Sequence, residues 1–449
     1  MRLIFKLLAA VSLLPASASA QPALDNYVTE ALKSNLVLRE RQVGLERSLL
    51  ALKEAKSYFL PTVGLEGQYT LAAGGRTIDL PVGDLMNPVY QTLNQLTGTS
   101  KFPQIANASE PLLPNNFYDL RVRTTMPLLN PDIRYGAGMR SEQVKLQQFE
   151  IDAYRRELVK DVKTAYYRLL QAARAADIYA NAVELVQQNL RVQRSLLRNG
   201  KGLPAYVSRA ESELQTVETQ WRNARNEVQN AGAYINFLCN KPLTDTVQRA
   251  EPVLPESLLG LNDATLPDVS RREELKSLSA AASINHWQQQ QARSYRTPRV
   301  NAFLDLGAQG FDFKVNRNTP FYLAGLQVQL PLFAGRRNEL RAQSATLEGK
   351  ALQLRTESVE KQLQLAAFVN RNGLQAAAAN YAAALKREES AQQYFKLIDR
   401  GYTEGVNSFI EFLDARNGLT NARLESNIQK YGLLIRAAEQ ERQTAAYAL

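Results

Sequence analysis

Four segments of the chain alternate between apolar and polar residues, which is the period of a β-strand with two different faces. The apolar positions are mostly Val, Leu, Ala and Tyr, and the positions between them are mostly Asp, Arg, Asn, Gln and Thr. The pattern predicts strands, each with one apolar and one strongly polar face, at about 60–71, 117–127, 298–311 and 321–331.

Between these strand pairs the hydrophobic period changes to heptads. Apolar residues, many of them alanine, follow a four-three spacing that is interrupted in the first long segment by Gln187 and Arg194. This spacing is typical of antiparallel coiled coils with closely approaching helices. It predicts helices at 134–199, 204–240, 336–400 and 406–447. The longest would reach about 100 Å at 1.5 Å per residue, which no ordinary globular core needs.

The same plan occurs twice along the chain. Pro331 follows Pro127 by 204 residues and Gly405 follows Gly202 by 203, and similar residues surround each pair. Two landmarks that keep nearly one separation indicate an internal repeat. We therefore divide the chain into a first repeat, a linker and a second repeat, at 21–240, 241–270 and 271–449.

The first repeat contains an insertion that the second lacks. Pro298 follows Pro61 by 237 residues, which is 33 more than the separation of the later landmarks. The extra residues fall in 72–116, a stretch rich in Gly, Pro and Asn without a sustained period. This composition predicts a long loop, which we expect to be external.

The N-terminus has the features of a secretory signal peptide. A basic start at Arg2 and Lys6 precedes a short apolar run and then Ala18 and Ala20. This order predicts a signal peptide at 1–20 that is removed during export. No later segment approaches the roughly 20 apolar residues that a transmembrane helix requires.

Charge and composition exclude several functional classes. The chain has one cysteine, Cys239, and one histidine, His286, so a His/Cys metal cluster or a Ser/His/Asp triad is not expected. The formal charge of +10 is scattered along helices without a nucleic-acid motif. The sequence thus predicts a protein without enzymatic activity, cofactor or nucleic-acid partner.

The four strands impose a constraint of their own. Their length suits a tilted crossing of a bilayer, but open strand edges cannot persist in hydrocarbon. Four strands cannot close a barrel around a lumen, so several chains must share one, and a homotrimer would supply about twelve strands. The predicted fold class is therefore mainly α, with long antiparallel coiled-coil helices, and with four strands per chain entering a trimeric transmembrane β-barrel.

The chain resembles the TolC-like family of outer-membrane efflux factors. The resemblance rests on the doubled plan, the prolines at strand ends, and the stretches PLFAGRRNELRAQSA and GYTEGVNSFIEFLDARNGLTNARLE. It implies that the long helices form a periplasmic α-helical barrel and that the strands form a twelve-stranded outer-membrane β-barrel. It also implies a passive exit duct of a tripartite efflux or type I secretion system, localised in the outer membrane with its tunnel in the periplasm. The implied partners are outer-membrane lipid, a periplasmic adaptor (membrane fusion protein) and an inner-membrane transporter.

The resemblance also implies which residues close the tunnel entrance. Gly202 and Gly405 would form the turns at the tunnel tip. Tyr402 matches a tethering tyrosine of the family, and Glu411 and Asp414 match acidic residues that ring the entrance. Asn407 replaces the family's arginine and Ser208 its acidic partner, which leaves a hydrogen bond from Tyr402 to the Ser208 region as the remaining tether.

Two alternatives stay open at this point. Glu411 and Asp414 lie at a helix start, where the helix dipole alone favours acidic residues. The whole chain could also be read as a periplasmic coiled-coil adaptor, although an adaptor typically has one helical hairpin and lacks four two-faced strands. The sequence does not name the cargo, which could be drugs, metals or proteins, or the pump.

Overall fold

The computed structural model describes residues 22–258 and 268–448, so the predicted signal peptide at 1–20 lies outside the described residues. The chain divides into two compact units. Unit 1 comprises Met1–Leu49, Glu142–Ser283 and Gly349–Leu449, and unit 2 comprises Leu50–Ser141 and Ile284–Glu348.

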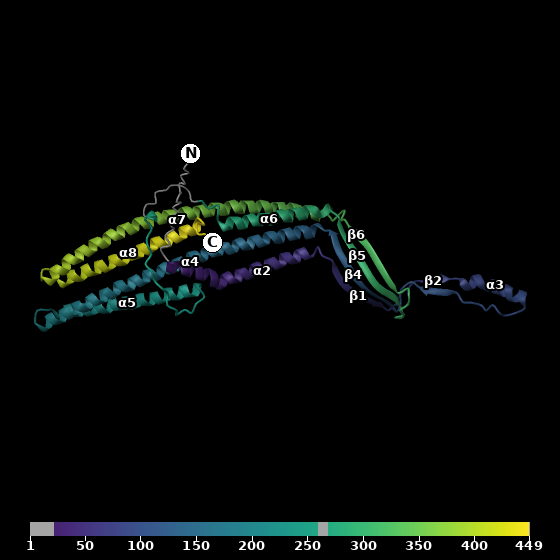
Figure 1. Cartoon of the computed structure of the whole chain (residues 1–449), viewed down its shortest axis with the longest axis horizontal. Helices are drawn as coiled ribbons and strands as arrows, with labels where there is room; N and C mark the ends of the chain where they lie inside the picture. Colours follow the sequence, from purple (N-terminus) through teal and green to yellow (C-terminus); the bar gives the residue numbers. More distant parts are fainter. Residues whose placement is uncertain (1–21, 259–267, 449) are drawn as a thin grey trace, which may run out of the picture. The chain divides into compact units, whose positions relative to one another are not determined.

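Unit 1 is built from helices, and two of its pairs form long hairpins (Figure 1). In the first hairpin α4 (Pro131–Arg198) turns back into α5 (Pro204–Leu238), and in the second α7 (Arg337–Thr403) turns back into α8 (Phe409–Gln443). Residues from both hairpins meet in shared apolar clusters. The shorter helices are α1 (Pro22–Ser34), α2 (Leu36–Ser57) and α6 (Glu273–Arg293), of which α2 and α6 continue into unit 2.

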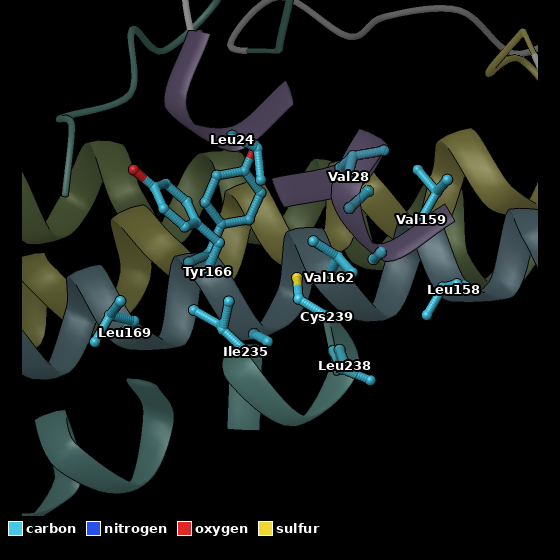
Figure 2. Packing of buried hydrophobic residues seen from close by; sticks show 14 of the residues in the cluster. Leu24, Val28, Leu158, Val159, Val162, Tyr166, Leu169, Ile235, Leu238 and Cys239 are labelled. Carbon is cyan, nitrogen blue, oxygen red and sulfur yellow. The ribbon is translucent and has the colours of Figure 1, made fainter. Parts of the chain in front are cut away.

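The largest apolar core of unit 1 joins the N-terminal helix to the hairpins. Figure 2 shows Leu24 and Val28 of α1 above Val162 and Tyr166 of α4. Cys239, just after α5, is buried in the same cluster, and its Sγ lies 3.6 Å from the Tyr27 carbonyl oxygen. The sole cysteine therefore has a packing role in this core.

The buried stripe of α4 differs from the predicted seam near the end of the helix. Gln187 is only half-buried and Arg194 is exposed, whereas Val186 and Gln193 are buried. The four-three spacing continues there, displaced by one residue toward the N-terminus. The reason is tertiary, because Gln193 and the buried Asn189 have polar partners on α7 that the hydrophobic period could not reveal.

Unit 2 contains a four-stranded antiparallel sheet in the order β1-β4-β5-β6 (Figure 1). Its strands are β1 (Thr62–Thr70), β4 (Phe117–Leu129), β5 (Arg299–Phe311) and β6 (Pro320–Gln329). Phe117 pairs with both Thr70 and Phe311, so the β1–β4 insertion and the β5–β6 turn leave the same end of the sheet. The strand ends that lead to the long helices lie at the other end.

The insertion at 72–116 has regular structure, so the prediction of a long loop was wrong. It contains a two-stranded ribbon, β2 (Thr77–Leu80) with β3 (Ala108–Pro111), and a helix, α3 (Val82–Thr97). Its Gly, Pro and Asn content concealed these elements, because asparagine side chains hold α3 in place through contacts distant in sequence. Among all the described helices, none is both long and apolar enough to cross a membrane.

Candidate functional site: the helix tip and the two-faced sheet

Both hairpins reverse through turns that depend on glycine, but by different means. Gly405 has φ of 79°, a conformation that residues with a Cβ resist. In the first hairpin this conformation belongs to Gly200, at φ 68°, and Gly202 serves for close approach. A Cβ on Gly202 would lie 2.7 Å from the Leu197 nitrogen. The structure thus aligns Gly405 with Gly200, because both precede the return helix by four residues.

In the second turn, between α7 and α8, Gly401 lies close to Asn407. Gly401, in the last turn of α7, faces Asn407, and a Cβ added at Gly401 would lie 1.9 Å from Asn407 Oδ1. The Gly401 carbonyl also accepts hydrogen bonds from the Val406 and Asn407 nitrogens, at 2.7 and 3.1 Å. Asn407 therefore helps to shape the turn within one chain.

Tyr402 is tethered inside its own chain, although not to Ser208. Its hydroxyl accepts a hydrogen bond from Gln193 Nε2 at 2.5 Å and lies 3.5 Å from Asn189 Nδ2. Its ring stacks on Phe412 with centroids 4.9 Å apart. Burial raises the pKa of the Tyr402 hydroxyl, and the two amides oppose that shift. Ser208 is exposed on α5, so the tether joins α7 to α4 instead.

Glu411 forms the capping box that starts α8. Its carboxylate accepts a hydrogen bond from the Ser408 nitrogen at 2.6 Å, while its own nitrogen donates to Ser408 Oγ at 3.3 Å. The Ser408 backbone N–H holds the pKa of the Glu411 carboxyl below its usual value. This geometry explains why α8 begins at Phe409, after the predicted start at 406.

Asp414 follows on the same exposed side of α8, one turn after Glu411. The residues between them, Phe412 and Leu413, are buried in an apolar cluster that we call the tip cluster. The buried members of the tip cluster come from α4, α5 and α8: Leu190, Ala210, Phe409, Phe412 and Leu413. The tip cluster therefore fixes the direction in which the acidic side chains project.

A buried ion pair that the sequence analysis did not single out links the two hairpins just behind the tip. Arg416 Nη2 of α8 lies 2.5 Å from Glu213 Oε1 of α5, with 2% and 13% of the two side chains exposed. Arg416 stands on the buried side of α8, where the heptad spacing would favour an apolar residue. That break in the period is the signal that could have identified it.

The main sheet has two chemically distinct faces. On one face the register aligns Leu65, Val122, Leu306 and Tyr322 across all four strands, and each of these side chains is at least 40% exposed in the single chain. The opposite face is charged over β1, β4 and β5. It is less polar than the sequence predicted over β6, because Phe321 and Leu323 project on this face.

An ion-pair cluster lies on the charged face. Asp305, whose side chain is fully buried, is held by Arg123 Nη2 at 2.7 Å and by Arg121 Nη1 at 3.5 Å. Glu66 lies 3.2 Å from Arg123, and Asp119 lies 2.6 Å from Arg121. The five side chains connect three neighbouring strands. Such a network of charges requires contact with water at its margin, in contrast to the apolar face.

The one histidine and the one cysteine contact an aromatic ring and a backbone carbonyl, respectively. His286 is exposed beside Trp287, and burial raises the pKa of the Cys239 thiol to about 11. Within residues 22–258 and 268–448, no three His, Cys, Asp or Glu side chains converge as metal ligands. The notable features of the described chain are thus a two-faced open sheet and paired helical hairpins.

Comparisons with known proteins relate the chain to outer membrane efflux proteins. The model of the family described as outer membrane efflux protein matches residues 270–445. The outer membrane protein TolC of Escherichia coli strain K12 is 22% identical over 446 residues, covering 93% of this chain and 81% of TolC.

Solved structures show the same fold. The outer membrane protein VceC of Vibrio cholerae superimposes with a TM-score of 0.75 at 15% identity, covering 95% of this chain and 97% of VceC. The CmeC outer membrane channel of Campylobacter jejuni gives 0.73 at 17% identity, covering 94% and 85%. Over residues 270–445 the chain is therefore similar to outer membrane efflux proteins, and over most of its length it has the fold of the outer-membrane channels VceC and CmeC.

Proposed function

We propose that the protein is a trimeric outer-membrane exit duct that conducts solutes passively. The observation that carries this proposal is the sheet of unit 2, in which β1 and β6 pair with no other described strand on their outer edges. In a bilayer such edges are tolerated only when they are closed. Pairing β6 of one copy with β1 of the next closes the sheet, and three copies supply about twelve strands around a lumen.

The chemistry of the two faces gives the orientation of the sheet in that barrel. The apolar face, with Leu65 and Leu306, would contact lipid, because removing apolar surface area from water is favourable. The face with Asp305, Arg121 and Arg123 would line the water-filled lumen. The charged cluster would then form three times around the pore.

The helical hairpins supply the rest of the duct. We propose that they form the periplasmic tunnel, which receives cargo from a periplasmic adaptor and an inner-membrane transporter. Opening the entrance requires the tips of the hairpins to move, and the Tyr402 tether and the tip cluster would restrain that movement. Energy comes from the transporter, so the duct itself needs no catalytic group. A periplasmic adaptor role would not account for the open sheet with one apolar and one charged face.

A pair of neighbouring β6 residues provides the test. Leu326 and Gln327 are both exposed in the single chain but project from opposite faces. Arginine on the lipid face costs about 2–4 kcal/mol at the bilayer centre, whereas the lumen face tolerates charge. We expect Leu326→Arg to reduce the yield of outer-membrane trimer, measured by particle mass in detergent, and Gln327→Arg to preserve it. A water-soluble monomer of the parent protein, or equal yields from both variants, would contradict the proposal.

The insertion between β1 and β4 would face the cell exterior, because the helices lead away from the other end of the sheet. Asn94 is unsuitable for a label, since its side chain bonds the Phe102 backbone. Ser100 is exposed and makes a better site. A membrane-impermeant maleimide should label Ser100→Cys in intact cells. Labelling only after the outer membrane is opened would reverse the topology.

We further propose that Glu411 and Asp414 from three copies ring the tunnel entrance. Glu411 already has a structural role in the capping box, so its replacement must preserve the helix start. Glu411→Gln with Asp414→Asn does so, because Gln also forms capping boxes. Planar-bilayer recordings should show weaker cation preference and less block by multivalent cations. Unchanged ion selectivity at normal trimer yield would contradict the ring and indicate that Glu411 and Asp414 only stabilise the start of α8.

A further inference from the structure

The insertion between β1 and β4 is a built module with a rigid inner side. Asn87 of α3 exchanges two hydrogen bonds with the Ile105 backbone, both at 2.9 Å. Asn94 exchanges two with the Phe102 backbone, at 2.7 and 3.1 Å. Asn107 closes the helix start by donating to Asp84 Oδ2 at 2.9 Å. The returning segment 102–107 therefore holds α3 in one orientation.

The outer side of α3 is an apolar stripe that no described part of the chain covers. Helical spacing places its members together, and Leu85 and Leu96 remain 69% and 79% exposed. We call this the α3 stripe, and its residues are Val82, Leu85, Met86, Val89 and Leu96. A third side of the helix, with Gln91 and Gln95, is exposed and polar. The helix is thus rotationally fixed with its apolar side outward.

We propose that the α3 stripe binds the same stripe of the other two copies, forming an apolar lid over the exit of the duct. This inference rests on the proposed function. The insertion follows β1, the strand that would lie at the junction between copies, so three α3 helices would surround one pore mouth. Identical uncharged stripes are complementary to one another, and burying them removes apolar area from water.

The composition of α3 favours a second copy over a lipid surface. Helices that lie on anionic membranes carry Lys and Arg on their polar side. α3 has no basic residue, and its one charge, Asp84, is bound by Asn107. Its polar side consists of Asn, Gln and Thr, which suits contact with water at a pore mouth. An apolar constriction can stop ions by excluding water, so the lid would limit leakage between transport events.

Cysteine cross-linking tests the contact directly. Cys239 is buried and the pKa of its thiol is raised to about 11, so we expect only an introduced cysteine to react under mild oxidation. We expect Leu85→Cys and Leu96→Cys to form disulfide-linked chains in the purified full-length trimer under mild oxidation. Gln91→Cys, which is exposed on another side of the same helix, is the matched control. Equal cross-linking of the three variants would overturn the inference.

Three further readouts separate the possible outcomes. Particle mass shows whether the trimer is present: a trimer without stripe-specific cross-links refutes the lid but preserves the proposed function, whereas absence of a trimer refutes both. Leu85→Gln with Leu96→Gln should raise single-channel conductance severalfold relative to Gln91→Asn at unchanged trimer yield. Quenching of a fluorophore at Leu85→Cys by spin-labelled lipid would place the stripe on the membrane and also refute the lid.

Discussion

Removing one partner of the Arg416–Glu213 ion pair should open the helical unit locally. Arg416 Nη2 and Glu213 Oε1 lie 2.5 Å apart. Burial lowers the pKa of Arg416, but the guanidinium keeps its positive charge. Arg416 Nε has no hydrogen-bond partner in the described structure. Glu213 is therefore the acid that balances this buried charge, and Glu213→Gln leaves the charge without compensation.

The expected cost follows from the burial of both groups. Breaking a buried ion pair costs about 3–5 kcal/mol, because the remaining charge stays desolvated. The substituted glutamine could still accept a hydrogen bond from Arg416, so we take the lower limit, about 3 kcal/mol. That corresponds to roughly a hundredfold rise in the local opening constant, at about 1.4 kcal/mol per tenfold. Replacing both partners, Glu213→Gln with Arg416→Met, should be close to neutral.

Native-state hydrogen exchange of the purified protein measures this opening. Amides of α5 and α8 around the pair should exchange roughly a hundredfold faster in Glu213→Gln and at about the parent rate in the double variant. Glu404→Gln is the control, because it breaks the exposed Arg400–Glu404 pair and should change exchange by no more than about twofold. A comparable effect in both single variants would refute the argument from burial.

Three more predictions concern the tip and the base of unit 1. Tyr402→Phe leaves Gln193 and Asn189 buried without their shared partner, and we expect a loss of about 1–3 kcal/mol in tip stability, detected as faster amide exchange at the end of α7 but not in α5 beyond the tip. Gly202→Ala should lower the yield of folded protein because its Cβ would lie 2.7 Å from the Leu197 backbone nitrogen, whereas Gly418→Ala, with open space around it, should be tolerated in the same assay. Burial alone would raise the pKa of Glu274, but hydrogen bonds from Arg272 and Arg442 lower it to about 2, below the unfolded value of about 4.3. Its stabilisation is complete above the unfolded pKa and is lost as pH falls toward the folded one, so the melting temperatures of the parent and Glu274→Gln should converge in acid; a constant difference would contradict this.

The periods of the chain were enough to locate the four strands of the main sheet and the two long helical hairpins. Apolar–polar alternation depends only on which face of a strand meets which solvent, so it identified both faces of the sheet over β1, β4 and β5. Heptads likewise report a continuous helical seam. The repeat, visible from a few landmarks such as Pro127 and Pro331, showed that one strand-and-hairpin unit occurs twice.

Contacts between residues distant in sequence decided the rest. Polar groups such as Gln193 and Arg416 occupy buried positions because their partners lie on another helix, more than 200 residues away. α3 was missed because Asn87 and Asn94 stabilise it through the returning segment rather than through a long apolar period. The turn glycines were assigned by analogy, yet backbone angle and close approach divide between Gly200 and Gly202. Periodicity shows which side of a helix or strand is buried. The pairing of buried polar groups and the space around a backbone depend instead on which elements pack together, and only the tertiary structure determines that packing.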